Sequence, residues 1–490
     1  MKKYNGVLRN TIISGIGWTY SEKLLTQIVS FFVSIILARL LSPEDYGILA
    51  LVNIFIGIAS AIALSGFGSA LIQRKEADNL DFSSTLFFSL GVSLISYIIL
   101  FFTSPLIAKF YNLADLVPII RIVSLSIVIS SINTVQHAYV IRKMLFRLFF
   151  LATFVGSIIS AMIGILMAYG GFGVWALVTQ YLSNSIINII MLTFISDWRP
   201  EFKFSLTRIK AIYSFGWKIT VSAVIDALYT QSRSIAIGKK YTVSDLAFYD
   251  KGSQFPNLII TNINSTISHV LMPVISSAQD DLPRVKAMVR RSLKTSSVIL
   301  FPVLIGLAAC AKGLIPLLLT QKWLPSVPYM QILCFAFMMR PIQTANLQGI
   351  LAIGRSDIYL RIQLVQKIIG IVIIAITILF FRTVVAVAIG EIVAQVLFSL
   401  IMIIPNSRYL NYSIEEQIVD ILPQMFVAIV MGVIVLQVLK FELSILAALV
   451  LQVTIGAIFY VGSLRLLQID SFMYLYRMLI EKVKNINYYL

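Results

Sequence analysis

The chain has little charge, only two histidines and only two cysteines, and each shortage excludes a class of protein. Charged residues make up 12% of the 490 residues, about half their share in ordinary soluble proteins, which excludes a soluble globular protein. Cys310 and Cys334 stand in apolar surroundings and offer neither a disulfide framework nor the spacing of a metal site. We expect both to be packing residues.

Motifs for nucleotide hydrolysis and for metal-dependent catalysis are also missing. No G-x-x-x-x-G-K-[ST] phosphate loop occurs, so the chain does not hydrolyse ATP by that route. No H-E-x-x-H occurs, and the two histidines, His137 and His269, are far apart in the sequence. We therefore expect no metal site, no cofactor and no enzymatic activity.

Hydrophobic residues, by contrast, make up 59% of the chain, and the mean hydropathy is +0.91. They form runs of about 20 residues, the length that a helix needs to cross a bilayer. A transmembrane β-barrel would need shorter segments of alternating character. No cleavable signal peptide is visible, because the first residues lead into a long apolar span without a small-residue cleavage site. We therefore predict an all-α polytopic membrane protein.

We count about 14 candidate spans joined by short links. The expected spans are residues 11–38, 46–70, 83–108, 114–139, 148–169, 172–195, 211–237, 246–275, 293–312, 327–352, 359–381, 384–404, 420–439 and 443–464. No link is long enough for a folded domain outside the membrane. That argues against a membrane glycan polymerase or ligase, a different class of polytopic protein, because such enzymes usually need a sizeable outer loop for their chemistry.

The net charge of +17 would suggest nucleic-acid binding in a soluble chain. If the N-terminus is cytoplasmic, however, 24 of the 39 lysines and arginines fall in inner segments, 8 in outer links and 7 within spans. Positive charge concentrates on the cytoplasmic side of membrane proteins. We therefore predict that both termini are cytoplasmic, which requires an even number of spans, and we expect no nucleic-acid partner.

The stretch from Thr11 to Gly47 is apolar enough to span a bilayer, yet it carries a charged pair inside its expected boundary. Glu22 and Lys23 share one side of the expected helix with Gln27 and other polar residues, within an arc of roughly 140°. A charge at mid-membrane costs about 2.5–3.5 kcal/mol on insertion scales, so this side should face protein or a watery cavity. The alternative is that the pair snorkels to an interface near the helix start.

The same pattern returns about 200 residues later in the chain. The turn Ser42–Asp45 is echoed by Thr242–Asp245, and an offset of six spans keeps the membrane orientation, as two parallel six-helix lobes would. We predict lobes at 1–200 and 201–410, followed at 411–490 by two accessory spans that face lipid and a cytoplasmic tail. The second polar side, within roughly 80° on span 211–237, consists of Lys218, Ser222, Asp226, Tyr229 and Arg233.

Cations within the spans outnumber the nearby acids by three, a surplus that ion pairing alone would not leave. Spare positive charge in a cavity suits a phosphate or pyrophosphate, and amides suit sugar hydroxyls. For single serines and threonines we favour helix–helix hydrogen bonding. The candidate cations are Lys23, Arg121, Lys218, Arg233, Lys251, Arg340 and Lys367. The candidate balancing acids are Glu22, Asp226, Asp250 and Glu391, and the polar lining is Gln27, Asn257, Thr261 and Asn264. The acids suit proton or Na⁺ coupling, but passive facilitation stays open.

Several stretches carry a resemblance to a known family, occur in the family's order and cover about two-thirds of the chain. They are ILARLLSPEDYG (36–47), GFGSALIQRKE (66–76), IAKFYN (107–112), GFGVWALVTQ (171–180), WRP (198–200), IGKKYTVSDLAFYDK (237–251), MPVISSAQDD (272–281) and KWLP (322–325). Together they resemble the polysaccharide transport family of Wzx-type lipid-linked oligosaccharide flippases. They are mostly loop and packing positions, so no substrate-binding residue is carried over.

The resemblance implies the multidrug/oligosaccharidyl-lipid/polysaccharide exporter fold, with two six-helix lobes plus two extra helices in a bacterial inner membrane. It implies that an undecaprenyl-pyrophosphate-linked oligosaccharide is flipped for O-antigen, capsule, exopolysaccharide or teichuronic acid assembly, alongside a polymerase and glycosyltransferases. We expect alternating access about a central cationic cavity, with Lys23, Lys218 and Arg233 first at the pyrophosphate. A peptidoglycan-precursor flippase is one alternative. A multidrug antiporter is another, but its cavity should be rich in acids.

Overall fold

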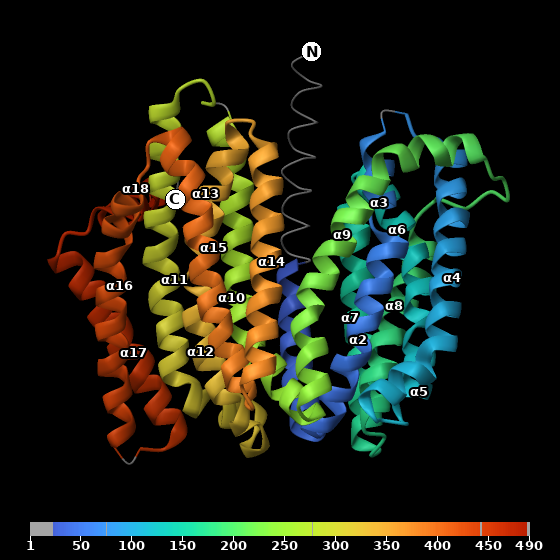
Figure 1. Cartoon of the computed structure of the whole chain (residues 1–490), viewed down its shortest axis with the longest axis horizontal. Helices are drawn as coiled ribbons and strands as arrows, with labels where there is room; N and C mark the ends of the chain where they lie inside the picture. Colours follow the sequence, from blue (N-terminus) through green and yellow to red (C-terminus); the bar gives the residue numbers. More distant parts are fainter. Residues whose placement is uncertain (1–22, 75, 277, 442, 488–490) are drawn as a thin grey trace. The chain divides into compact units, whose positions relative to one another are not determined.

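The structure, a computed structural model, describes residues 23–74, 76–276, 278–441 and 443–487, without the side chains of 215, 266–274, 276, 478–480 and 482–487. The described residues form helices and no strand (Figure 1). Among them, 11 helices are long and apolar enough to cross a membrane, or up to 12 if the bent helix α9 counts as one span. The prediction of an all-α multi-pass membrane protein is confirmed.

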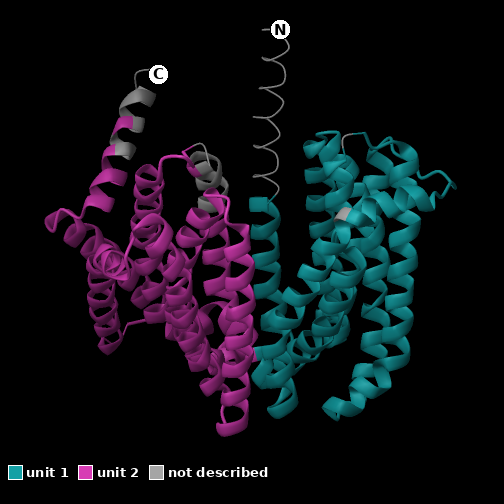
Figure 2. Ribbon diagram, turned by 45° about the horizontal axis from the view of Figure 1, so that its top comes forward, with its two compact units in different colours: residues 1–247 teal, residues 248–490 magenta. Residues whose placement is uncertain are grey.

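The chain divides into two compact units, residues 1–247 and 248–490 (Figure 2). The described helices of unit 1 are Lys23–Leu40, α2 (Pro43–Leu64), α3 (Phe67–Gln73), α4 (Asn79–Tyr111), α5 (Leu116–Val123), α6 (Leu125–Arg142), α7 (Phe146–Tyr169), α8 (Val174–Ile195) and α9 (Leu206–Lys240). Helix α10 (Val243–Ser276) begins in unit 1 and continues into unit 2. The further helices of unit 2 are α11 (Leu282–Leu319), η1 (Gln321–Ser326), α12 (Val327–Phe337), α13 (Arg340–Ala352), α14 (Ser356–Phe380), α15 (Val384–Leu410), α16 (Ile414–Gln437), η2 (Val438–Lys440), α17 (Ile445–Leu466) and α18 (Asp470–Asn487).

The predicted lobes, 1–200, 201–410 and 411–490, differ from these units in the place of α9. We expected α9 to open the second lobe, whereas it packs against α2, α3 and α4 within unit 1. The lobe boundaries stay a prediction, because a compact unit defined by packing need not coincide with a sequence repeat. Three of the expected spans are not long and apolar enough to cross a membrane as one straight helix, yet all three are helical. They correspond to α9, to α10 and to the pair α12 and α13.

Several expected spans are interrupted rather than continuous. Helices α2 and α3 are separated at Gly66, whose φ of +88° lies in the left-handed region that favours glycine. The carbonyl that this break frees at Ser65 accepts a hydrogen bond from Thr220 Oγ1 of α9 at 2.5 Å. Helices α5 and α6 meet at Ser124, and α9 bends by 57° between Leu206–Ser214 and Gly216–Lys240. Interrupted helices are tolerated in membranes where neighbouring side chains satisfy the freed backbone groups.

The repeated turn has the same hydrogen bonds in both of its copies. Ser42 Oγ donates to the Asp45 carboxylate at 2.7 Å, and the Asp45 N–H donates back to Oγ at 3.2 Å. Thr242 Oγ1 and Asp245 make the equivalent bonds at 2.7 and 3.1 Å. Each pair is a capping box that satisfies free N–H groups at the start of a helix, α2 in one case and α10 in the other. The matching geometry supports the internal repeat.

Helix α2 approaches α9 and the start of α10 so closely that glycine is required at the contact. A Cβ atom on Gly47 would lie 2.1 Å from the backbone oxygen of Val243, and one on Gly238 would lie 2.3 Å from Leu51 Cδ2. These positions leave no room for a methyl group. Glycine therefore allows α2 and α9 to run side by side.

Replacing Gly47 with alanine is expected to destabilise the protein by about 1–3 kcal/mol, the cost of overpacking. The new methyl group would meet backbone rather than the end of a flexible side chain. Gly91→Ala is the matched control, because a Cβ there meets nothing within 4 Å. Removing a helical glycine should leave stability unchanged or raise it by about 0.5–1 kcal/mol. Thermal unfolding in detergent measures both, and equal behaviour of the two variants would contradict the close approach.

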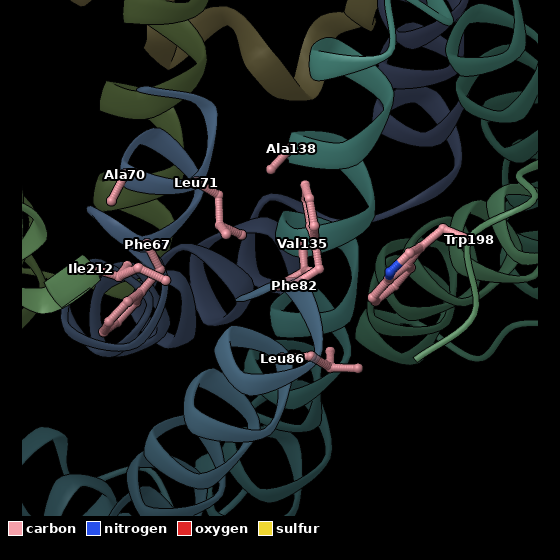
Figure 3. Close-up of a cluster of buried hydrophobic side chains, with 9 residues drawn as sticks. All are labelled: Phe67, Ala70, Leu71, Phe82, Leu86, Val135, Ala138, Trp198 and Ile212. Carbon is pink, nitrogen blue, oxygen red and sulfur yellow. The ribbon is translucent and has the colours of Figure 1, made fainter. Parts of the chain in front are cut away.

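A cluster of buried hydrophobic side chains joins α3, α4 and α6 to the segment that leads into α9 (Figure 3). Its members are Phe67, Ala70, Leu71, Phe82, Leu86, Val135, Ala138, Trp198 and Ile212. Trp198 comes from the loop between α8 and α9, and Ile212 from the first part of α9. The cluster therefore fixes the start of α9 within unit 1.

Candidate functional site: the polar face of α9

Helix α9 presents charged side chains on a face that is not covered by its neighbours. Lys218, Ser222 and Asp226 are exposed, and their spacing of four residues places them on one side of the helix. Within the described part of the chain, Lys218 has no ion pair. Arg233 is half-buried about two turns beyond Asp226 on the same side. The face formed by these four residues is called the α9 polar face below. Charged groups on a membrane helix require water or polar partners, so this face is suited to bind a polar ligand.

The first described helix, Lys23–Leu40, also has polar side chains outside the side that packs against its neighbours. Val33 and Leu37 are buried in a cluster with α7 and α8, whereas Lys23 is exposed and Gln27 is half-buried. Glu22, the predicted partner charge of Lys23, lies outside the described residues. The assignment of these three residues to the substrate site stays a prediction.

Two of the candidate cations lie in packed surroundings instead. Arg121 of α5 donates from Nε to Ser104 Oγ at 3.2 Å and lies over the ring of Phe101 at 4.2 Å, so α4 holds it. Lys251 is 6% exposed, donates to Gln254 Oε1 at 3.1 Å and lies 5.8 Å from the ring centre of Trp323. Both residues were predicted from the surplus of cations within the spans, which gave no information on what packs against them.

The remaining candidates belong to unit 2 and are not gathered at one point by the interactions of the described residues. Glu391 is buried in an amide network, accepting from Gln395 Nε2 at 2.7 Å, while Gln343 Nε2 donates to Gln395 Oε1 at 2.9 Å. Arg340 is half-buried with its guanidinium 5.3 Å from the Phe337 ring centre. The others are the exposed Asn257 and Thr261 and the half-buried Asp250, Asn264 and Lys367. Their proposed roles stay predictions.

A buried ion cluster that the sequence did not reveal joins α16 to α11. Asp420 is 4% exposed and accepts two hydrogen bonds from Arg290, at 2.6 and 2.8 Å. Lys294 Nζ lies 2.9 Å from the same carboxylate, and the Tyr412 hydroxyl donates to it at 2.7 Å. The carboxylate is thus fully satisfied, and bidentate Arg–carboxylate pairs are among the strongest charged contacts. The sequence signal was present, an acid within the first turns of an apolar helix, but its cationic partners lie about 130 residues earlier.

The two accessory helices, expected to face lipid, also pack against other helices of unit 2. Gln417 and Asn346 exchange side-chain hydrogen bonds at 2.8 and 3.1 Å, joining α16 to α13. Further along, the Tyr460 hydroxyl of α17 donates to the Val298 carbonyl of α11 at 3.0 Å. Outer faces of both helices remain apolar and exposed, as membrane helices require.

The fold is similar to that of two solved membrane transporters. The chain matches the inward closed conformation of the Lipid II flippase MurJ with a TM-score of 0.76 and 15% identity, covering 92% of this chain and 99% of that one. It matches an inward-facing multidrug resistance MATE family transporter of the MOP superfamily with a TM-score of 0.62 and 14% identity, covering 79% and 94%. At this identity the similarity shows the fold alone.

Sequence comparison identifies the family. The model of the family described as polysaccharide biosynthesis protein matches residues 36–328, and the chain belongs to that family. The succinoglycan biosynthesis transport protein ExoT of Rhizobium meliloti is 26% identical, over 66% of this chain and 66% of that protein, slightly less than two thirds of its length. The lipopolysaccharide biosynthesis protein WzxC of Escherichia coli is 24% identical over 72% of each chain. The teichuronic acid biosynthesis protein TuaB of Bacillus subtilis is 24% identical over 71% and 72%.

Proposed function

We propose that the chain is a flippase that moves an undecaprenyl-pyrophosphate-linked oligosaccharide across the bacterial inner membrane by alternating access. The observation that carries the proposal is the α9 polar face on a member of the polysaccharide biosynthesis family. A pyrophosphate needs cationic donors, and sugar hydroxyls need small polar groups. Lys218 and Arg233 would bind the pyrophosphate, with Asp226 as balancing charge.

The relatives support this assignment because each is named for the biosynthesis or transport of a polysaccharide. Succinoglycan, lipopolysaccharide and teichuronic acid are different polysaccharides, yet proteins named for their biosynthesis or transport align with most of this chain. The step common to them that suits a multi-helix membrane protein is passage of a lipid-linked unit through the bilayer. We propose that a polymerase and glycosyltransferases act next to the chain and that the chain itself is not an enzyme.

The orientation belongs to the same proposal. Lysine and arginine concentrate in the segments that adjoin the starts of α4, α9 and α11, and the positive-inside rule assigns that side to the cytoplasm. Both termini then lie in the cytoplasm. The acids Asp226, Asp250 and Glu391 would carry protons or Na⁺ if transport is coupled to an ion gradient.

A peptidoglycan-precursor flippase is the second candidate, since the Lipid II flippase MurJ has the higher TM-score of the two solved structures described above. Both candidates would bind a pyrophosphate, so the α9 polar face does not distinguish between them. Their substrates differ in the attached glycan, which is what an experiment must compare. A multidrug antiporter is less favoured, because a cationic drug suits an acidic face rather than one with Lys218 and Arg233.

Reconstitution tests the proposal directly. Vesicles carrying a lipid-linked oligosaccharide in both leaflets are treated with an impermeant glycosidase. Without the protein only the outward-facing half of the substrate should be cleaved; with the protein all of it should be, because flipping resupplies the outer leaflet. Peptidoglycan precursor is the comparison substrate, and imposed proton and Na⁺ gradients report coupling. Cleavage that stops at one half for both substrates would contradict the proposal.

A further inference from the structure

The loop between α8 and α9 holds the most exposed large hydrophobic side chain among the described residues. Phe202 is 97% exposed, and the neighbouring Phe204 and Leu206 are 49% and 63% exposed. Burying a phenylalanine is worth about 1.5–3 kcal/mol relative to leaving it in water. Three exposed apolar side chains within five residues are therefore costly unless something other than water covers them.

The loop is held firmly in this arrangement by the start of α4. Trp198 Nε1 donates to Asn79 Oδ1 at 2.7 Å, and Asn79 Nδ2 donates to Glu201 Oε1 at 2.7 Å. The Glu201 N–H donates to Ser83 Oγ at 2.9 Å. The Ser205 N–H likewise donates to Ser84 Oγ at 3.1 Å. Hydrogen bonds on both sides of Phe202 fix the backbone of the loop, so the exposed position of the Phe202 side chain is set by the fold.

The ring of Phe202 continues the lipid-facing side of α4. Its centre lies 5.9 Å from that of Phe87, and the loop runs beside this end of α4 in Figure 1. Phe87 shares one helical side with Leu94, Ile98 and Phe102, which are exposed along a membrane-length helix. Phe202 therefore lies where that apolar side reaches the end of the span.

Cations accompany the aromatic residues. Lys203 is 71% exposed and pairs with Glu201 at 2.9 Å, a contact that lowers the pKa of the Glu201 carboxyl so that both groups stay charged. Arg199 and Lys210 are exposed, and Arg199 donates to nearby backbone carbonyls. Residues 196–210 hold four cations and two acids. Basic residues next to an apolar surface attract anionic phospholipids at about 1 kcal/mol each.

We propose that the loop Ser196–Ser205 and the first segment of α9, Leu206–Ser214, anchor unit 1 to the membrane interface. Phe202, Phe204 and Leu206 insert at the boundary of head groups and acyl chains, as amphipathic interfacial segments do. Lys203 and Lys210 contact anionic phospholipid head groups. The 57° bend of α9 then separates an interfacial segment from a membrane-spanning one. This anchor does not depend on the transported substrate.

Spin labelling of the full-length protein in vesicles of phosphatidylcholine and phosphatidylglycerol tests the apolar part. Phe202→Cys carries the label, and the wild-type chain gives the background, since Cys310 and Cys334 are buried. Ile98→Cys on the lipid-facing side of α4 and Asp280→Cys in the exposed α10–α11 loop are the controls. We expect the Phe202 label, like that at Ile98, to collide more with oxygen than with a water-soluble nickel chelate. Preference for nickel, as expected at Asp280, would overturn the proposal. Shielding from both reagents would also overturn it, since a second copy or a protein partner would then cover the loop.

A second experiment tests the contact between the lysines and anionic head groups. In pure phosphatidylcholine the oxygen preference of the Phe202 label should fall, and Lys203→Gln with Lys210→Gln should reduce it to the same level in the anionic vesicles. Arg382→Gln with Lys440→Gln removes the same charge from exposed positions elsewhere and should change nothing. An oxygen preference that is independent of both lipid charge and the two lysines would overturn the assignment of anionic lipid.

Discussion

Replacing Lys218 and Arg233 together with glutamine is expected to abolish surface display of the polysaccharide while the protein stays in the membrane at its normal level. Each cation that donates to a charged phosphate is worth about 1.5–3 kcal/mol. Losing both should weaken productive binding by roughly 100-fold or more. Display is measured by lectin or antibody staining of cells in which the chain is the sole flippase.

The exposure of Lys218 is what makes this variant informative. Because the Lys218 side chain is exposed and has no ion pair among the described residues, its loss should not unfold unit 1. The matched control is the double variant Arg382→Gln with Lys440→Gln, which changes the net charge equally at two exposed positions. Normal display in the Lys218 and Arg233 variant would remove the α9 polar face from the transport pathway.

Replacing Asp420 with alanine is expected to give the largest loss of stability, about 3 kcal/mol, the lower end of the cost of breaking a buried ion pair. Arg290 and Lys294 would lose their shared carboxylate, and the Tyr412 hydroxyl would lose its acceptor. The lower end applies because the Arg290 side chain is 42% exposed, so water can solvate part of it. Thermal unfolding of the purified protein in detergent measures the loss.

The exposed pair Arg355–Asp357 provides the control for that measurement. Its side chains are 40% and 48% exposed at a separation of 2.9 Å. Exposed ion pairs contribute about 0–1 kcal/mol, so Asp357→Ala should change stability little. Similar losses in Asp420→Ala and Asp357→Ala would contradict the view that α16 is fixed to α11 by a buried ion cluster.

The helices of this protein could be predicted from the sequence because a membrane span has a simple requirement, a continuous apolar run. The repeated turn could be predicted as well, since Ser42–Asp45 and Thr242–Asp245 cap helices through local hydrogen bonds. The break at Gly66 could not. Gly66 has a positive φ, and the freed carbonyl beside it, that of Ser65, is satisfied by Thr220, more than 150 residues away.

The same distinction between local and distant interactions decides which features of the candidate site could be predicted. Periodicity placed Lys218 and Asp226 correctly on one side of α9, because that relation is internal to a helix. Periodicity gave no information on what packs against a side. Nor did the surplus of cations within the spans, from which Lys251 was predicted, show that this residue is buried beside Trp323. The Asp420 cluster was missed for the same reason, because its partners come from a distant helix.

Binding of undecaprenyl pyrophosphate, compared with uncharged undecaprenol, tests most directly whether the α9 polar face binds the pyrophosphate. Native mass spectrometry of the purified protein measures both lipids. The wild-type chain should prefer the pyrophosphate, and the variant Lys218→Gln with Arg233→Gln should bind the two lipids equally. A preference that survives in the variant would contradict the assignment of the pyrophosphate to α9.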